Sequence, residues 1–561
     1  MKKKTWFIVY IVATSLFIFL MYYLTLPALN FGSVGFYFFL ALIVSFGLSI
    51  YFIKRVPYLR EKNKGMTYKR RYLDRNGTSH VKIIDADTKF NGVIQSLKAY
   101  VITFGSVVVL ILLFLIIGSK LFSSRAYYNQ LPYQESTEEE LVETFDIDDG
   151  KVLLPNIDKE LAYKLAQGSL EEYGAQYTIN PDKFTLLSIK ENGVDKLVRI
   201  APLEYSNVFV ALAKKNEGSI GYIQVDVVTK EVKLVKVEGG IKYMPSGVFG
   251  KDISRHIRFK YPTVLFNELN FEIDDNGKPY WIVPIHKKSI GVLNGPKQTG
   301  VIVLDPVTGD MEKYELGKEP SWVDRAINEQ IISKQATNRL RYKNGFFNVH
   351  FGEKKEVFQL SDGYNYFIKD GNTYYVSSIT SPNEGDQTSI GFMAINLKTG
   401  VATRYNFSGI TEMRAREIAM NDASVKAQQL DATWPILIGY RGVETYFIVL
   451  KNSVKEQYVV FVKVADGELA MGATLQDAKT EYDRLLASSD VTENDLKITG
   501  TIDRVRDLGD TIEFTLVGSD KYFVVNPTIS TDARFMQSGD IVNISYKDFE
   551  DYYYVTEYKK Q

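Results

Sequence analysis

The side chains that could do chemistry in this chain are few and far apart. It contains no cysteine and four histidines, which are His80, His256, His286 and His350. No His-Glu-x-x-His, Gly-x-Ser-x-Gly or phosphate-binding loop motif joins any of them to a partner residue. The lack of cysteine also excludes disulfides, zinc-thiolate sites and thiol catalysis. The sequence therefore predicts no catalytic residue, no metal site and no cofactor. A carboxylate pair, which is defined by its separation in space, is the remaining enzymatic alternative.

Asp or Asn, Thr and Gly recur at a fixed spacing, and this pattern predicts turns rather than catalysis. It is clearest in Gly300–Met311 (GVIVLDPVTGDM), repeats in Gly391–Ala402, is looser in Gly221–Val232 and is degenerate in Tyr458–Leu469. The short acidic or amide side chain can cap a turn, and glycine supplies the positive φ with which the chain reverses. We expect hairpin turns built by Asp226, Thr229, Asp305, Thr308, Gly309, Asn396, Thr399, Gly400, Asp466 and Gly467.

Three apolar runs near the N-terminus predict a membrane anchor. Residues 6–26, 31–53 and 99–117 contain no charged residue and no histidine, and about 20 apolar residues suffice to span a bilayer as a helix. A cleaved signal peptide is the alternative for the first run, but that run is long and no small-x-small cleavage site follows it. Because ionisable residues inside spans mark ion pathways, their absence argues against a transporter.

Charge is sorted along the chain in a way that predicts the orientation of the anchor. Residues 1–121 contain 16 Lys and Arg against 4 Asp and Glu, whereas the whole chain has 67 of each kind. The positive-inside rule places the N-terminus and the loop 54–98 in the cytoplasm and everything after about residue 120 outside it. The basic loop could also touch anionic lipid headgroups, although it could serve only as a topology signal. The candidate lipid contacts are Arg55, Lys62, Lys64, Lys69, Arg70 and Arg71.

A composite unit recurs in the outer region. Each copy starts with a helix-like stretch, continues with an aromatic-rich strand pair and closes with the turn described above. The helix-like stretches are Asp158–Tyr173, Asp252–Tyr261, Ser321–Lys334 and Thr411–Leu430. The divisions we expect are a transmembrane anchor (1–121), an acidic linker (122–150), four units (151–240, 241–319, 320–408 and 409–473), a helical linker (474–493) and a small β-barrel (494–561). The expected fold class is a three-span helical anchor with α+β repeats, antiparallel sheets and this barrel.

This order of one helix and an antiparallel meander resembles the PepSY domain family. The best match is Asp252–Tyr314, which contains DISRHIRFKY, FEIDDNGKPYWIVPI and GVIVLDPVTGDMEKY, and Thr411–Leu469 is the next best. The chain departs from the pattern by long insertions such as Ser381–Ser389 and by Lys230 in place of a turn glycine. The resemblance implies extracytoplasmic modules with regulatory or inhibitory roles, often toward proteases, and carries over no catalytic residue.

The last seventy residues have the strand count and rhythm of a small barrel. Five candidate strands, 497–505, 511–517, 521–525, 540–546 and 552–558, are separated by Gly-Asp and Gly-Ser-Asp turns, which resembles an OB-fold. Such barrels can bind polymers through exposed aromatic residues, so Tyr552, Tyr553 and Tyr554 are of interest, although packing is the simpler interpretation of them. The acidic outer region makes nucleic acid an unfavourable ligand.

Together these features predict a non-catalytic, multi-pass protein of the bacterial cell envelope. Its extracytoplasmic units would bind or regulate an envelope or membrane protein, for instance by adding strands at sheet edges. One alternative is an accessory subunit of a membrane machine for secretion, conjugation or wall synthesis. Another is an envelope hydrolase whose site is not recognisable in the sequence.

Overall fold

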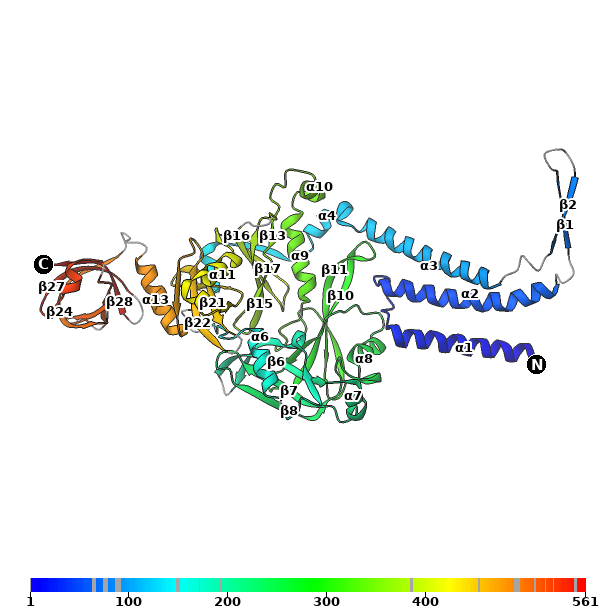
Figure 1. The fold of residues 1–561 in the computed structure, drawn as a ribbon, viewed down its shortest axis with the longest axis horizontal. Coiled ribbons are helices and arrows are strands. Elements are labelled where there is room, and N and C mark those ends of the chain that lie inside the picture. The colour runs from blue at the N-terminus through cyan, green and yellow to red at the C-terminus, as the bar shows by residue number, and fades with distance from the viewer. Residues whose placement is uncertain are drawn as a thin grey trace.

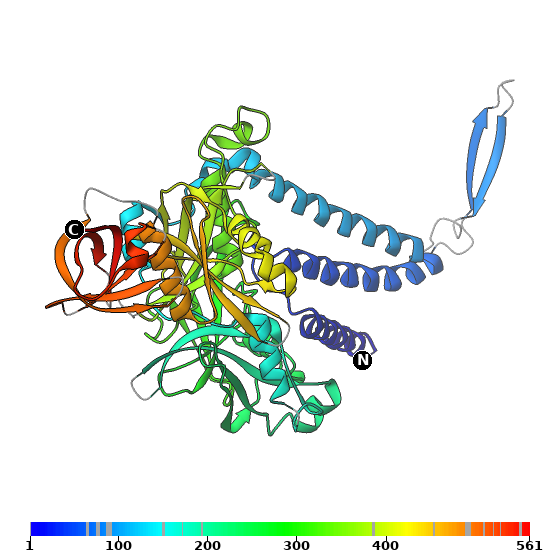
Figure 2. The ribbon, with the colours of Figure 1, turned by 60° about the vertical axis from the view of Figure 1, so that its left-hand side comes forward.

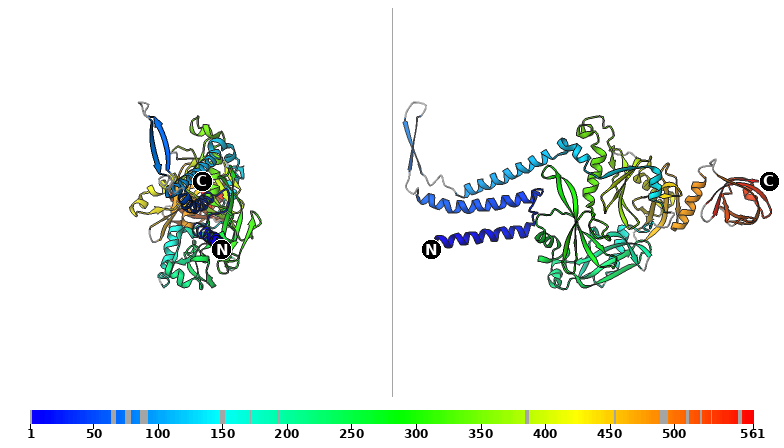
Figure 3. Two further views of the ribbon diagram at one scale, coloured as in Figure 1. Left: turned by 90° about the vertical axis from the view of Figure 1, so that its right-hand side faces the viewer. Right: turned by 180° about the vertical axis from the view of Figure 1, so that it is seen from behind.

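The structure is a computed structural model that describes most of the chain. The described residues are 2–62, 67–73, 79–85, 92–147, 152–170, 172–191, 194–383, 387–452, 455–488, 495–508, 511–519, 521–527, 529–548 and 552–561. The side chains of residues 2–9, 51–97 and 194–195 lie outside that description. Three long helices project from one side of a folded body, and a small barrel lies at the opposite end (Figure 1). The same arrangement is visible from other sides (Figures 2 and 3).

The projecting helices are α1 (Lys2–Thr25), α2 (Val34–Lys62) and α3 (Gly92–Ile117). The rings of Phe17 and Phe46 stack at 3.7 Å between α1 and α2, and those of Tyr37 and Phe114 lie 5.9 Å apart between α2 and α3. Within the described residues, one helical segment, Lys98–Ile117, is long and apolar enough to cross a membrane. Two shorter apolar segments, Tyr10–Thr25 and Val34–Ile50, accompany it. The prediction of three spans therefore stays a prediction. Beyond α2, β1 (Thr67–Leu73) and β2 (Ser79–Asp85) form an antiparallel hairpin.

The first half of the body consists of two antiparallel sheets that share one core. The first sheet has the order β4-β6-β7-β8 with β5 also paired to β6, and the second has the order β12-β11-β10-β9. Phe271 lies 5.8 Å from Tyr222 and 5.2 Å from Trp281, ring to ring, and thereby joins the two sheets. The elements of this half are α6 (Lys159–Gly168), β4 (Tyr177–Ile179), η2 (Pro181–Lys183), β5 (Thr185–Glu191), β6 (Val194–Tyr205), α7 (Val208–Lys214), β7 (Ser219–Asp226), β8 (Val232–Ile241), η3 (Phe249–Lys251), α8 (Ile253–Lys260), β9 (Asn270–Ile273), β10 (Pro279–Ile290), β11 (Asn294–Leu304) and β12 (Met311–Glu315).

The second half also pairs two sheets. The third sheet has the order β13-β15-β16-β17-β3, with β14 and β18 attached, and the fourth has the order β19-β21-β22-β23, with β20 attached. Strand β21 reads ETYFIVLK after its first residue and is buried along most of its length, as expected for a strand covered on both faces. The elements are α9 (Glu329–Arg341), α10 (Gly345–His350), β13 (Gln359–Leu360), β14 (Asn365–Lys369), β15 (Asn372–Thr380), β16 (Thr388–Asn396), β17 (Ala402–Tyr405), β18 (Gly409–Ile410), α11 (Glu412–Asn421), α12 (Ala423–Ala427), β19 (Asp431–Ala432), β20 (Ile436–Tyr440), β21 (Val443–Lys451), β22 (Glu456–Lys463), β23 (Leu469–Gly472) and α13 (Leu475–Ser488).

The segment 122–150, which we expected to be an acidic linker, is part of the folded body, so that prediction is wrong for its described residues. Helix α4 (Lys120–Tyr128) precedes β3 (Tyr133–Ser136), which pairs in parallel with β17. Helix α5 (Glu138–Thr144) then places Phe145 in the core between the third and fourth sheets, 4.5 Å from Phe367, ring to ring. Three acidic residues, Glu138, Glu139 and Glu140, lie at the first turn of α5, where they complement the helix dipole. The acidic composition therefore reflects the exposed side of a helix.

The C-terminal strands close into a five-stranded barrel, which confirms the prediction of a small barrel. Strands β24 (Leu496–Asp507), β25 (Ile512–Leu516), β26 (Tyr522–Val525), β27 (Ile541–Asp548) and β28 (Tyr552–Lys560) follow the order β24-β25-β26-β28-β27, and η4 (Asp532–Phe535) precedes β27. Tyr552 and Tyr554 are buried, and Tyr553 packs 4.8 Å from Phe523, ring to ring. The hydroxyl of Tyr552 donates to Asp483 on α13 at 3.3 Å. These tyrosines pack the barrel and tie it to α13.

Candidate functional site

The turn residues singled out in the sequence make one recurring pattern of hydrogen bonds. In three turns a side-chain oxygen of Asp226, Asp305 or Asn396 accepts from the two amides that lie two and three residues ahead, at 2.8–3.1 Å. The hydroxyl oxygens of Thr229, Thr308 and Thr399 each accept from the amide two residues ahead. Gly309 and Gly400 have φ of +86° and +74°, and Lys230 takes the same conformation at φ +67°. These residues are therefore turn formers, and the departure at Lys230 leaves the turn intact.

The fourth turn keeps the shape with different residues. The amide of Gly467 donates to the carbonyl of Lys463 at 2.9 Å, as Gly309 does to Asp305. Lys463 thus occupies the capping position, and Asp466 takes the place of the threonine by accepting from the amide of Glu468 at 3.0 Å. An ion pair of 2.7 Å between Lys463 and Asp466 replaces the side-chain cap.

The three histidines of the folded body, His256, His286 and His350, are single side chains with packing roles. His256 makes a 2.8 Å hydrogen bond through Nε2 with the carbonyl of Gly309 and lies against Tyr243. Burial lowers the pKa of His286 to about 4, and His350 packs on Phe346. Within the described ranges, no group of three or more His, Asp or Glu is placed to hold a metal ion.

The structure assigns most of the candidate lipid contacts to a helix or strand but does not describe their side chains. Arg55 and Lys62 belong to α2, and Lys69, Arg70 and Arg71 belong to β1. Their side chains lie outside the described residues, as does the whole of Lys64.

The feature with the most ionisable groups is a cavity of about 950 Å³ between the two halves of the body. A cavity of this size is at the upper end of the range typical of ligand sites. A larger space of about 1160 Å³ is lined by the second part of β5, Leu187–Glu191, whereas Thr185 and Leu186 line the space of 950 Å³. We call the 950 Å³ space the central cavity. Its lining includes Arg199 and residues of Pro155–Tyr163, Pro181–Leu186, Asn267–Asn270, Arg325–Gln330, Tyr364–Tyr366 and Thr433–Ile436.

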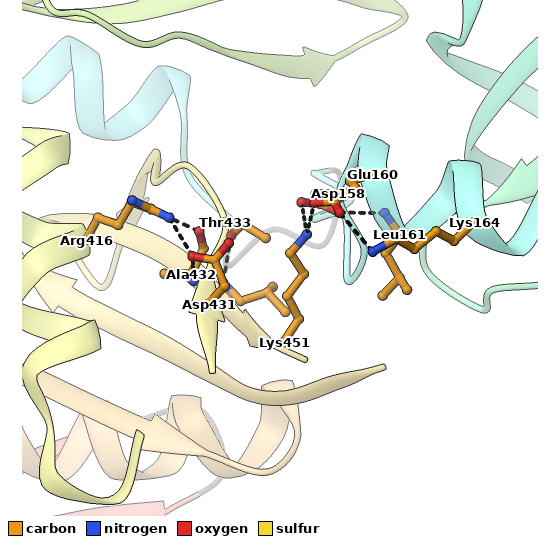
Figure 4. A network of polar contacts seen from close by, with 10 residues as sticks. Asp158, Glu160, Leu161, Lys164, Arg416, Asp431, Ala432, Thr433 and Lys451 are labelled. Atoms are coloured by element: carbon orange, nitrogen blue, oxygen red, sulfur yellow. Dashed lines mark hydrogen bonds and ion pairs between the residues drawn. The ribbon is translucent and has the colours of Figure 1, made fainter. Parts of the chain in front are cut away.

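A charged network joins the halves beside this cavity (Figure 4). The side chain of Asp158 caps α6 by accepting from the amide of Leu161 at 2.9 Å. Lys451, which is buried at the end of β21, pairs with Asp158 at 2.6 Å and with Glu160 at 3.1 Å. Lys164 adds a further pair with Glu160 at 2.8 Å, and Lys164 followed by Lys451 lowers the pKa of Glu160 to about 2. These pairs satisfy the carboxylates at this side of the cavity.

A second network surrounds Arg325 on the opposite wall. Its guanidinium forms an ion pair with Glu329 and lies 4.4 Å from the centre of the Tyr366 ring. The hydroxyl of Tyr366 donates to Glu329 at 2.7 Å. Burial opposes the charge of Arg325, but Glu329, Tyr366 and Glu272 together outweigh it and raise the pKa of Arg325. The buried carboxylate of Glu272 accepts from the amide of Arg325 at 3.0 Å, so the backbone is fixed as well.

Arg199 differs from these residues because it has no acidic partner. It projects from β6, is 7% exposed and donates one long hydrogen bond of 3.5 Å to the carbonyl of Phe184. No carboxylate in the described part of the chain lies within ion-pair distance of it, and its Nε has no hydrogen-bond partner. Burial lowers the pKa of Arg199 to about 10, which leaves it charged at neutral pH. A buried, unpaired charge of this kind is costly.

Two further residues that line the central cavity, Lys159 and Glu268, have shifted pKa values. Burial and then the charge of Arg199 lower the pKa of Lys159. Burial and then the charge of Glu329 raise the pKa of Glu268 to about 7. Perturbed groups that converge on one cavity mark a candidate binding or catalytic site.

The sequence analysis missed this cavity. In the sequence, Arg199 could have indicated a buried polar site, because it interrupts the otherwise apolar strand segment LVRIAPL. Neither a family model nor a curated protein matches the chain.

Proposed function

We propose that this chain is a membrane-anchored, non-catalytic binding protein of the bacterial cell envelope, and that the central cavity holds a segment of a partner protein. The observation that carries the proposal is the cavity of about 950 Å³ between the two halves, with converging charged groups of perturbed pKa. Because both halves line it, an occupant would contact both at once. Such contacts suit a protein that regulates or restrains its partner.

The proposal includes a three-span anchor with the N-terminus in the cytoplasm and the body outside. The span-length segment Lys98–Ile117 and the apolar segments of α1 and α2 beside it support this anchor. The excess of Lys and Arg before residue 121 supports the orientation. The proposed regulatory role is the one that the resemblance of the sequence to the PepSY family implies.

Cysteine labelling tests location and occupancy together, because the natural chain has no cysteine to interfere. We expect a membrane-impermeant maleimide to label both Tyr364→Cys and Phe535→Cys in intact cells. Tyr364 lines the cavity and is 47% exposed, whereas Phe535 lies on the barrel and is 71% exposed. Relative to purified full-length protein, labelling in cells should be several-fold slower at Tyr364→Cys alone.

Two results would contradict the proposal. If neither cysteine reacts until the cells are lysed, the body is not outside the cytoplasm. If Tyr364→Cys reacts equally fast in cells and in purified protein, the cavity has no occupant.

A further inference from the structure

The unpaired guanidinium of Arg199 is the starting point for the chemistry of the occupant. A buried arginine without an ion-pair partner destabilises the protein, because the attraction of Asp158 from beyond ion-pair distance offsets the desolvation of its charge only in part. An arginine fork is suited to bidentate pairing with a planar anion. The wall of the cavity therefore offers a site that an anionic group would complete.

Two other donors line the same cavity. Lys159 is exposed at its edge and forms no ion pair with any described residue, and burial followed by the charge of Arg199 lowers its pKa, so the two cations are close in space. The indole N–H of Trp434 is buried without a hydrogen-bond partner among the described residues. Both residues line the central cavity. The lining thus contains an unpaired guanidinium, an unpaired indole N–H and an exposed ammonium.

The acidic residues of the lining are mostly engaged elsewhere. Asp158 and Glu160 pair with Lys451, and Glu329 pairs with Arg325. Glu268, with a pKa of about 7, is partly neutral at physiological pH, and Asp182 is exposed at the edge. These negative charges would repel a dianion such as phosphate more than a single carboxylate. Apolar lining residues such as Phe184 and Phe447 also suit a ligand that carries its charge on an organic frame.

We propose that the central cavity recognises a carboxylate of the partner polypeptide, with the guanidinium of Arg199 as its anchor and Lys159 and Trp434 as further donors. This inference rests on the proposed function, because the carboxylate belongs to the protein segment that occupies the cavity.

Thermal unfolding of the full-length protein in detergent tests the inference with two probe peptides, N-acetyl-Ala-Glu-Ala-amide and N-acetyl-Ala-Gln-Ala-amide. A ligand that binds the native state alone raises the unfolding midpoint. We expect the glutamate peptide, and not the glutamine peptide, to raise the midpoint of the natural protein. Arg199→Met should abolish that rise. Without peptide, its midpoint should equal or exceed that of the natural protein, since an unpaired buried charge is removed.

Arg506→Met is the matched control, because Arg506 lies on the barrel and its side chain is 74% exposed. It should respond to the glutamate peptide as the natural protein does. The inference is overturned if the two peptides act alike on the natural protein or if Arg199→Met keeps the response. A lower midpoint of Arg199→Met without peptide would also overturn it, by assigning Arg199 a structural role.

The peptide experiment and the cysteine labelling together show which of the two proposals fails. If the glutamate peptide has no effect while Tyr364→Cys stays protected in cells, the carboxylate inference fails and the proposed function stands. If the peptide response is present while Tyr364→Cys is unprotected, the cavity binds carboxylates but does not hold a partner in cells.

Discussion

Glu268 illustrates how burial sets the protonation of single residues in the central cavity. Its carboxyl accepts a 3.0 Å hydrogen bond from the side-chain amide of Asn270, yet burial raises its pKa to about 7. Burial also raises the pKa of two further carboxyl groups, those of Glu272 and Asp324. These buried carboxyl groups therefore keep protons to a higher pH than the same residues would in the unfolded chain.

This has a consequence for stability that depends on pH. Between about pH 4.5 and about pH 7 the native state binds more protons at Glu268 than the unfolded state does, so the stability falls as the pH rises. Glu268→Gln should reduce the fall in the unfolding midpoint between about pH 5.5 and about pH 8, and should be at least as stable as the natural protein at the higher pH. Part of the fall of the midpoint with pH should remain, because Glu272 and Asp324 contribute to it as well. The difference between the thermal unfolding midpoints at the two pH values measures this fall.

Glu191→Gln is the control for this prediction. Hydrogen bonds from Lys196 and Lys233 lower the pKa of Glu191 to about 2, so its contribution is constant over the tested range and the slope should not change. An unchanged slope in Glu268→Gln would contradict the assignment of the raised pKa to that residue.

At the scale of elements, the stretch that joins α3 to the body shows how packing overrides composition. Phe145 follows α5, is fully buried, and lies 5.8 Å from both Phe392 and Tyr405, ring to ring. Phe145→Ala should lower the free energy of unfolding of the body by about 3–5 kcal/mol, as truncation of a buried phenylalanine does. The midpoint of urea unfolding measures this change. Phe347→Ala, at a position 66% exposed, should change it by less than about 0.5 kcal/mol. Equal midpoints for the two variants would mean that the segment is a linker after all.

Helices begin where the sequence predicts them when the sequence contains a capping residue at that position. Asp158 and Asp252 were expected at helix starts, and each caps the helix that begins one residue later, α6 and α8. The helix expected over Ser321–Lys334 instead begins at Glu329, after the cap Asn328. The preceding residues are held in irregular form because the amides of Asp324 and Arg325 donate to the carboxylate of Glu272. That partner lies 52 residues away, so local periodicity could not reveal it.

At the scale of the whole molecule, the antiparallel sheets, the barrel and the turn residues could be expected from local patterns, since strand alternation and turn chemistry are local. The pairing of the sheets could not, because it depends on contacts such as that of Phe271 with Tyr222 between distant strands. The central cavity is a product of the way the two halves meet, for instance through the ion pair of Lys451 with Asp158. Its residues, among them Arg199, Lys159 and Trp434, come from segments far apart in the sequence, so its chemistry became visible only in three dimensions.

The central claim is that this cavity holds a protein partner, and photo-crosslinking in intact cells tests it most directly. A photoreactive phenylalanine analogue would replace Tyr364, which lines the cavity, and Phe535 on the barrel would serve as the control position. We predict one discrete protein adduct from position 364, absent from position 535, whose crosslinked peptide contains an Asp, a Glu or the C-terminal carboxylate of the partner. No protein adduct at position 364, or the same adducts from both positions, would contradict the account.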